Sequence, residues 1–179
     1  MNNIHVFDDF LTTEELDKCE KVLKCPAWTF GQMSNSSHFS TPFWIMMLSD
    51  DTFFNTQLLS KIQNKTGKMF TLIRVYANGQ TFGQDGTFHT DSLSDDDYTF
   101  CIYINKQITH KTVDNIGGEI VFKLPNSNTG SDSPFSRVMI EPIYNRGILF
   151  PSNFFHKGLA FNRYSKELRV SIAWKLKLL

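Results

Sequence analysis

Residues 168–176, near the end of the chain, constrain the fold more than any other stretch. Their side chains alternate between large apolar groups and small or polar ones, which is the pattern of a β-strand with two unlike faces. The apolar face comprises Leu168, Val170, Ile172 and Trp174. The other face comprises Arg169, Ser171 and Ala173. A lone guanidinium on a small face predicts a pocket for a carboxylate, which Arg169 would grip with two parallel hydrogen bonds and Ser171 with a third.

Short strand-like runs separated by turn signals fill the second half of the chain. They lie at residues 70–76, 98–104, 117–125, 137–140 and 147–150, with Ala77–Gln80 expected as a turn and Asn126–Ser136 as a polar loop. Many short strands favour a sandwich or barrel. The 17 phenylalanines favour strands packed around an aromatic interior. With 179 residues, the chain is expected to form one domain, residues 1–179.

Two helices are expected before these strands. Thr12 and Glu15 form a capping box at the start of the first, followed by an apolar stripe. Asp51 or Thr52 would cap a second helix that runs to about residue 64. Residues 26–43 read as a loop, and Phe43–Leu48 as a strand. The predicted fold class is therefore mainly β with flanking helices.

A candidate metal site is carried by His89 and Asp91, which lie two residues apart. On an extended strand such residues point to the same face, so the imidazole and the carboxylate converge. His156 is the candidate third ligand. Two histidines and one carboxylate form the ligand set of a mononuclear Fe(II) site with open positions. Each of these residues taken alone is better explained as an ordinary turn or core residue. The strand with Arg169, which follows His156, is what favours a metal site for the three together.

Together, the His-x-Asp pair, the distal histidine and the Arg-x-Ser strand resemble the 2-oxoglutarate/Fe(II)-dependent dioxygenases, most nearly their prolyl 4-hydroxylase-like branch. The resemblance covers the chain from about Val6 to Lys177. It implies a double-stranded β-helix (jelly-roll) core and Fe(II) held by His89, Asp91 and His156. It also implies 2-oxoglutarate and O2 as cosubstrates, and allows for ascorbate.

The resemblance further implies contacts to 2-oxoglutarate. Arg169 and Ser171 would anchor its distal carboxylate, Tyr103 would reach the same C5 carboxylate, and Tyr76 would flank the cosubstrate. From the residues alone, the plain interpretation of both tyrosines is a core aromatic whose hydroxyl has a partner. Lys166, which precedes the strand, is the alternative anchor to Arg169.

The implied activity is oxidative decarboxylation of 2-oxoglutarate to succinate and CO2, coupled to hydroxylation of a C–H bond. By resemblance, the substrate would be a prolyl residue in a peptide or protein, with a small molecule as the alternative. Two rival functions stay open: a non-catalytic jelly-roll binding protein, and a metal-dependent hydrolase on the same barrel. A zinc hydrolase can use the same ligand types, although no His-Glu-x-x-His helix occurs in the sequence.

Charge and cysteine content narrow the expected partners and location. The 18 basic and 18 acidic residues balance, which argues against strong non-specific nucleic-acid binding. The three cysteines form no Cys-x-x-Cys pair and indicate a reducing compartment. Without an apolar membrane span or a signal peptide, a cytoplasmic protein with no membrane partner is expected. The acidic run Asp95–Asp97 is predicted to be a solvated loop, with selection of a basic substrate as its alternative.

Overall fold

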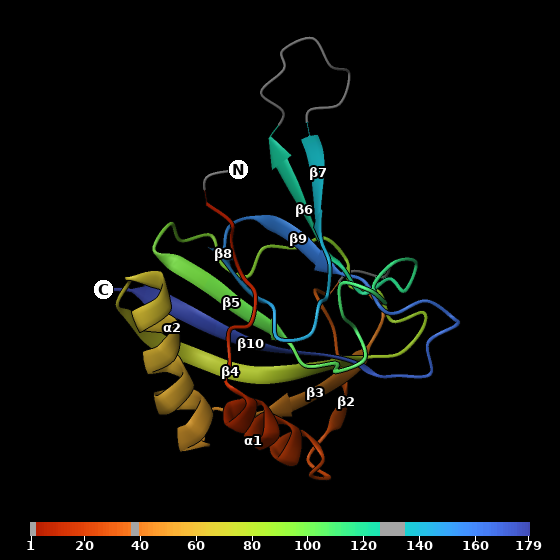
Figure 1. Cartoon of the computed structure of the whole chain (residues 1–179). Helices are drawn as coiled ribbons and strands as arrows, with labels where there is room; N and C mark the ends of the chain where they lie inside the picture. Colours follow the sequence, from red (N-terminus) through yellow and green to blue (C-terminus); the bar gives the residue numbers. More distant parts are fainter. Residues whose placement is uncertain (1–2, 37–39, 126–134) are drawn as a thin grey trace.

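The computed structural model describes residues 3–36, 40–125 and 135–179, which form two antiparallel sheets and two helices (Figure 1). The larger sheet has the strand order β1-β8-β5-β10-β4-β3-β2. Its strands are β1 (His5–Phe7), β2 (Thr29–Gln32), β3 (Phe43–Met47), β4 (Phe70–Gln80), β5 (Asp97–Tyr103), β8 (Gly147–Pro151) and β10 (Arg169–Leu178). The smaller sheet, in the order β7-β6-β9, consists of β6 (Ile120–Pro125), β7 (Phe135–Ile140) and β9 (Phe155–Gly158).

The helices cover one face of the larger sheet, and the smaller sheet lies over the other (Figure 1). Helix α1 (Thr13–Leu23) begins at the predicted capping box, in which Glu15 N–H donates to Thr12 Oγ1 at 3.3 Å and Thr12 N–H donates to Glu15 Oε2 at 2.7 Å. The second helix begins with a π-helical segment, η1 (Phe53–Leu58), and continues as α2 (Leu59–Thr66). The predicted mainly β architecture with flanking helices is confirmed.

Strand β10 lies near the middle of the larger sheet, between β4 and β5, and separates two apolar clusters. On the helix side, Ile172 and Trp174 pack among buried residues of both helices. On the opposite side, Ala173 packs with Tyr76 and Tyr103 between the two sheets. The alternation in the sequence thus gives a strand with one face on the helix-side core and the other face between the sheets.

Two expected irregular segments are strands. Ala77–Gln80 continues β4 rather than turning, and residues 29–32, expected in a loop, form the edge strand β2. The predicted turn at Ala77–Gln80 is wrong because Gly79 permits close packing inside a strand rather than a turn. A Cβ at this position would lie 2.8 Å from Leu168 Cδ2 and 3.1 Å from the Trp28 ring. A glycine inside a strand often marks such a close approach.

Three further points concern strand β9, the predicted loop Asn126–Ser136 and membrane-spanning helices. Strand β9 was not expected, because it is short and is held by pairing with β6 rather than by a local pattern. Most of the predicted polar loop Asn126–Ser136 lies outside the described residues, while its end belongs to β7. None of the helices in the described ranges has both the length and the apolar character needed to cross a membrane.

Candidate metal centre and adjoining pocket

Backbone pairing brings the two candidate histidines together from distant parts of the sequence. His89 N–H donates to His156 O at 3.0 Å, and His156 N–H donates to His89 O at 2.9 Å. The imidazole rings therefore lie side by side, with centroids 4.5 Å apart. Asp91 N–H donates to Ser152 O at 2.8 Å, which fixes the carboxylate next to the rings.

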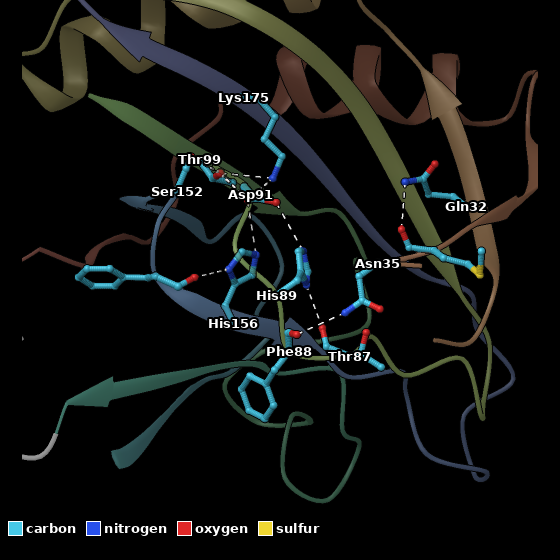
Figure 2. A network of polar contacts seen from close by, with 12 residues as sticks. Gln32, Asn35, Thr87, Phe88, His89, Asp91, Thr99, Ser152, His156 and Lys175 are labelled. Carbon is cyan, nitrogen blue, oxygen red and sulfur yellow. Dashed lines mark hydrogen bonds and ion pairs between the residues drawn. The ribbon is translucent and has the colours of Figure 1, made fainter. Parts of the chain in front are cut away.

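His89, Asp91 and His156 all turn toward one point, as Figure 2 shows. The His89 Nε2 atom lies 3.5 Å from Asp91 Oδ1, and the His156 Nε2 atom lies 3.5 Å from Asp91 Oδ2. One ligand atom from each residue falls within 4.8 Å of the others. Three donors this close can bind a single metal ion.

The hydrogen bonds of the two rings leave the correct nitrogens available for a metal. His89 Nδ1 lies 2.9 Å from Thr87 O, and His156 Nδ1 lies 2.9 Å from Phe154 O. Because a carbonyl only accepts, Nδ1 carries the proton in each ring and the Nε2 lone pair faces the cluster. Burial lowers the pKa of His156 to about 4, so this imidazole is neutral near neutral pH, as a metal ligand must be.

Asp91 is held by a buried polar network that includes Lys175. This role for Lys175 was not predicted from the sequence. The Asp91 Oδ2 atom accepts a hydrogen bond from Thr99 Oγ1 at 2.6 Å and contacts the Lys175 ammonium (Figure 2). Burial acts to raise the pKa of Asp91, but Lys175 and the neighbouring histidines outweigh it and hold that pKa well below its usual range. The carboxylate is therefore charged, and Oδ1 remains available to a metal.

The sequence does contain a signal for Lys175. The small face of the last strand runs through every second residue, Arg169, Ser171 and Ala173, and the next position is Lys175. Continuing the alternation by one step would have placed this lysine on the pocket side. A lysine near the end of a strand is usually exposed, which is why the prediction stopped short of it.

One cavity of about 220 Å³ connects the predicted site residues. Its lining includes the three candidate ligands and the four residues predicted to contact 2-oxoglutarate: His89, Asp91, His156, Tyr76, Tyr103, Arg169 and Ser171. Lys166, the alternative anchor, is exposed and does not line it. The placement favours Arg169 over Lys166.

Arg169 is a buried cation, 4% exposed, that pairs with no carboxylate among the described residues. Its Nε donates to Gly118 O at 2.8 Å, and its Nη1 donates to Gln80 Oε1 at 2.8 Å and to Ser171 Oγ at 3.3 Å. Neutral groups thus fix the guanidinium without balancing its charge. A buried charge is costly unless an opposite charge balances it, so this one calls for an anionic ligand.

Tyr103 adds a second unsatisfied group beside Arg169. The Arg169 Cζ atom lies 5.1 Å from the centre of the Tyr103 ring. The Tyr103 hydroxyl is buried and has no hydrogen-bond partner within the described ranges. Burial raises the pKa of Tyr103, so the hydroxyl keeps its proton and can donate. A carboxylate in this part of the cavity would satisfy both residues at once.

The Gly117–Gly118 turn supports this end of the cavity. Both residues have positive φ, of 78° and 88°, and Gly118 supplies the carbonyl that accepts from Arg169. A Cβ on Gly118 would lie 2.5 Å from the Phe161 ring. Only glycine fits at position 118, so this turn, which precedes β6, also positions the arginine.

The remaining polar residues singled out from the sequence lie away from the cavity. Asp97 accepts from Ser92 at 2.6 Å within its own segment, and Asp95 accepts from Asn153, in the connection between β8 and β9, at 2.8 Å. Neither aspartate lines the cavity, which gives no support to a role in selecting a basic substrate. His38, which the sequence places in the expected loop at residues 26–43, lies outside the described residues.

No protein-family model matches the sequence, and a search of curated proteins finds no match. Solved structures do match. A 2OG-Fe(II) oxygenase family oxidoreductase from Burkholderia pseudomallei has a TM-score of 0.73 and 12% identity, over 98% of this chain and 85% of that one. A Trichoplax adhaerens prolyl hydroxylase, solved with a hypoxia inducible factor peptide, has a TM-score of 0.70 and 17% identity, over 99% and 84%.

A third similar structure is the non-heme alpha ketoglutarate dependent epimerase SnoN from nogalamycin biosynthesis. Its TM-score is 0.66 at 13% identity, over 98% of this chain and 78% of that one. At such low identities the likeness concerns the fold. The predicted jelly-roll core, of the kind found in 2-oxoglutarate/Fe(II) oxygenases, is confirmed.

Proposed function

We propose that this protein is an Fe(II)- and 2-oxoglutarate-dependent dioxygenase that hydroxylates a C–H bond. One observation carries the proposal: a single cavity contains a three-ligand cluster and a buried arginine that has no anionic partner among the residues the structure describes. The likeness to solved oxygenases agrees with it, and SnoN has been solved with Fe3+ and alpha ketoglutarate. The fold alone would not decide function, since one fold hosts many chemistries.

The ligand set fits iron of this class. His89 Nε2, Asp91 Oδ1 and His156 Nε2 would hold Fe(II) and leave its other coordination positions open for cosubstrates. Iron bound there, with 2-oxoglutarate and O2, would supply the oxidative decarboxylation and the hydroxylation. Thr87 O and Phe154 O keep both rings in the tautomer that such binding needs.

The chain's own part would be to bind and orient 2-oxoglutarate. Arg169 would meet its distal carboxylate, Tyr103 would donate its hydroxyl, and Ser171 would add a third contact. Charge-assisted hydrogen bonds of this kind are stronger and more directional than neutral ones. Because Gln80 and Gly118 already fix the guanidinium, little further ordering would be needed on binding.

For the substrate, we propose a prolyl residue in a peptide or protein. The Trichoplax adhaerens prolyl hydroxylase, solved with a peptide, supports this choice. The epimerase SnoN, on the same fold, keeps a small molecule as the second candidate. A metal-dependent hydrolase would not need a buried carboxylate-binding arginine, so the surroundings of Arg169 count against that rival.

Replacing Arg169 by glutamine should weaken 2-oxoglutarate binding by about 100-fold or more, because each hydrogen bond to a charged group contributes about 1.5–3 kcal/mol. The measurement is calorimetric titration of 2-oxoglutarate into protein loaded with Mn(II), which does not turn over. Arg169→Lys should recover the charge but not the forked geometry, and so bind with intermediate affinity.

Lys166→Gln is the matched control for this titration, because Lys166 is exposed and lies outside the cavity. Its affinity for 2-oxoglutarate should equal that of the wild type. If Lys166→Gln lost the affinity and Arg169→Gln kept it, the anchor would be the lysine.

A further inference from the structure

The cavity around the metal centre carries more positive charge than the proposed iron and 2-oxoglutarate can balance. Its charged lining consists of three cations, Arg74, Arg169 and Lys175, and one carboxylate, Asp91, a formal excess of two positive charges. A bound divalent ion and a 2-oxoglutarate dianion cancel each other. The excess of two would therefore remain, although the whole chain has a net charge of zero.

The cations lie at opposite ends of one strand face. Arg169 pairs with Gln80, whereas Lys175, on the same face of β10, pairs with Arg74 on β4. Arg169 and Lys175 are six positions apart, so their Cα atoms are about 20 Å apart at roughly 3.4 Å per residue. A 2-oxoglutarate that runs from Arg169 to the metal beside Asp91 would still leave Arg74, which lies on β4 opposite Lys175, without an anion. The Arg74 end of the cavity would remain for another molecule.

Arg74 is the cation at this end that the protein does not satisfy. Lys175 already contacts Asp91 and lies 3.3 Å from Thr99 Oγ1. Arg74 forms no hydrogen bond or ion pair within the described part of the chain, and it is exposed at the cavity. Its Cζ atom lies 5.0 Å from the centre of the Tyr76 ring, and Lys175 Nζ lies 5.8 Å from the same ring.

This stacking prepares Arg74 to bind a carboxylate. A guanidinium over a tyrosine ring is held in place by the cation–π attraction, while its N–H groups remain available at the edge of the plane. A carboxylate can accept two of these N–H groups in parallel. Met33 and Phe43 line the same cavity and offer apolar surface to the carbon skeleton of a ligand.

We propose that Arg74 forms a substrate subsite for a carboxylate, so that the substrate of this enzyme is acidic. The substrate's carboxylate would lie at Arg74 while its reactive C–H bond faces the metal centre. Two sources share this chemistry: an aspartate or glutamate beside the target residue in a peptide, and a small carboxylic acid. This inference rests on the proposed function, whose cosubstrate would occupy the Arg169 end.

The test compares acids with their neutral amides on protein loaded with Mn(II) and 2-oxoglutarate. One pair of probes is the blocked peptides Ac-Glu-Pro-Glu-NH2 and Ac-Gln-Pro-Gln-NH2, and the other is N-acetyl-L-proline and N-acetyl-L-prolinamide, whose nitrogens carry no charge. Paramagnetic broadening of probe proton signals by Mn(II) reports binding next to the metal without requiring turnover. In at least one pair, the acid should bind about tenfold more tightly than its amide, as expected for charge-assisted hydrogen bonds.

The pair that shows the larger difference identifies the source of the carboxylate. Arg74→Gln should remove the difference. Arg163→Gln is the matched control, because Arg163 also stacks on a tyrosine, with Cζ 5.3 Å from the centre of the Tyr164 ring, but lies outside the cavity. That variant should keep the difference.

Equal binding of acid and amide by the wild type, absence of binding by all four probes, or an acid preference that survives Arg74→Gln would each overturn the subsite. The same Mn(II) protein is first titrated with 2-oxoglutarate. Failure at that earlier step would count against the proposed function itself, and so the two failures are distinguishable.

Discussion

Replacing His89 by alanine should remove metal binding and 2-oxoglutarate turnover while leaving the fold in place. Loss of one of three ligands should lower Fe(II) affinity by more than about 100-fold, since removing even an outer partner of a ligand costs about 10–100-fold. The fold should survive because the side chain is 20% exposed and its hydrogen bond to the Thr87 carbonyl is not part of the apolar core. Anaerobic Fe(II) titration, succinate assay and thermal unfolding are the three measurements.

The matched control is His110→Ala, which removes a histidine whose side chain is 68% exposed and lies away from the cavity. It should bind Fe(II) and form succinate like the wild type. Retention of tight Fe(II) binding by His89→Ala would remove that residue from the ligand set.

Replacing Asp91 by alanine should have a different outcome, because it should also destabilise the protein. Lys175 is buried against the Asp91 carboxylate, and its other close partners are the Thr99 hydroxyl at 3.3 Å and the Tyr76 side chain. Removing one partner of a buried pair leaves an uncompensated charge and typically costs about 3–5 kcal/mol. Urea unfolding of the metal-free protein should show a loss of this size.

The double variant Asp91→Ala/Lys175→Met separates the two roles of the carboxylate. Methionine removes the charge and keeps much of the volume, so most of the lost stability should return while Fe(II) binding stays absent. If the double variant were as unstable as Asp91→Ala alone, the lysine charge would not be the cause. If Asp91→Ala unfolded like the wild type, the ion pair would contribute nothing to stability.

Local patterns were sufficient for the strand that divides the molecule. The alternation through Ile172 and Trp174 predicted a strand with two unlike faces, and both faces are buried as that pattern requires. The two-residue spacing of His89 and Asp91 likewise predicted convergence on one point, and the backbone pairing with His156 supplies the third donor. The direction of these side chains along the strand and at the His-x-Asp pair is set by backbone geometry over a few residues.

Contacts between residues far apart in the chain could not be predicted from local sequence patterns. Gly79 read as a turn residue because its reason, close packing on Leu168 and Trp28, involves residues far along the chain. Lys175 continues the alternation of its strand, but its contact with Asp91, 84 positions away, is not visible in that local pattern. Arg74 was not singled out, since the proposal for it depends on its pairing position opposite Lys175, which only the register of β4 and β10 reveals.

The central claim is that one cavity binds Fe(II) and 2-oxoglutarate together, and an anaerobic absorbance titration tests it most directly. Fe(II) is added to metal-free protein, and 2-oxoglutarate follows. The account predicts a visible charge-transfer band that appears only when both are present, that is lost in His89→Ala and that needs higher 2-oxoglutarate concentrations in Arg169→Gln. Tight Fe(II) binding with no band at any 2-oxoglutarate concentration would contradict the account.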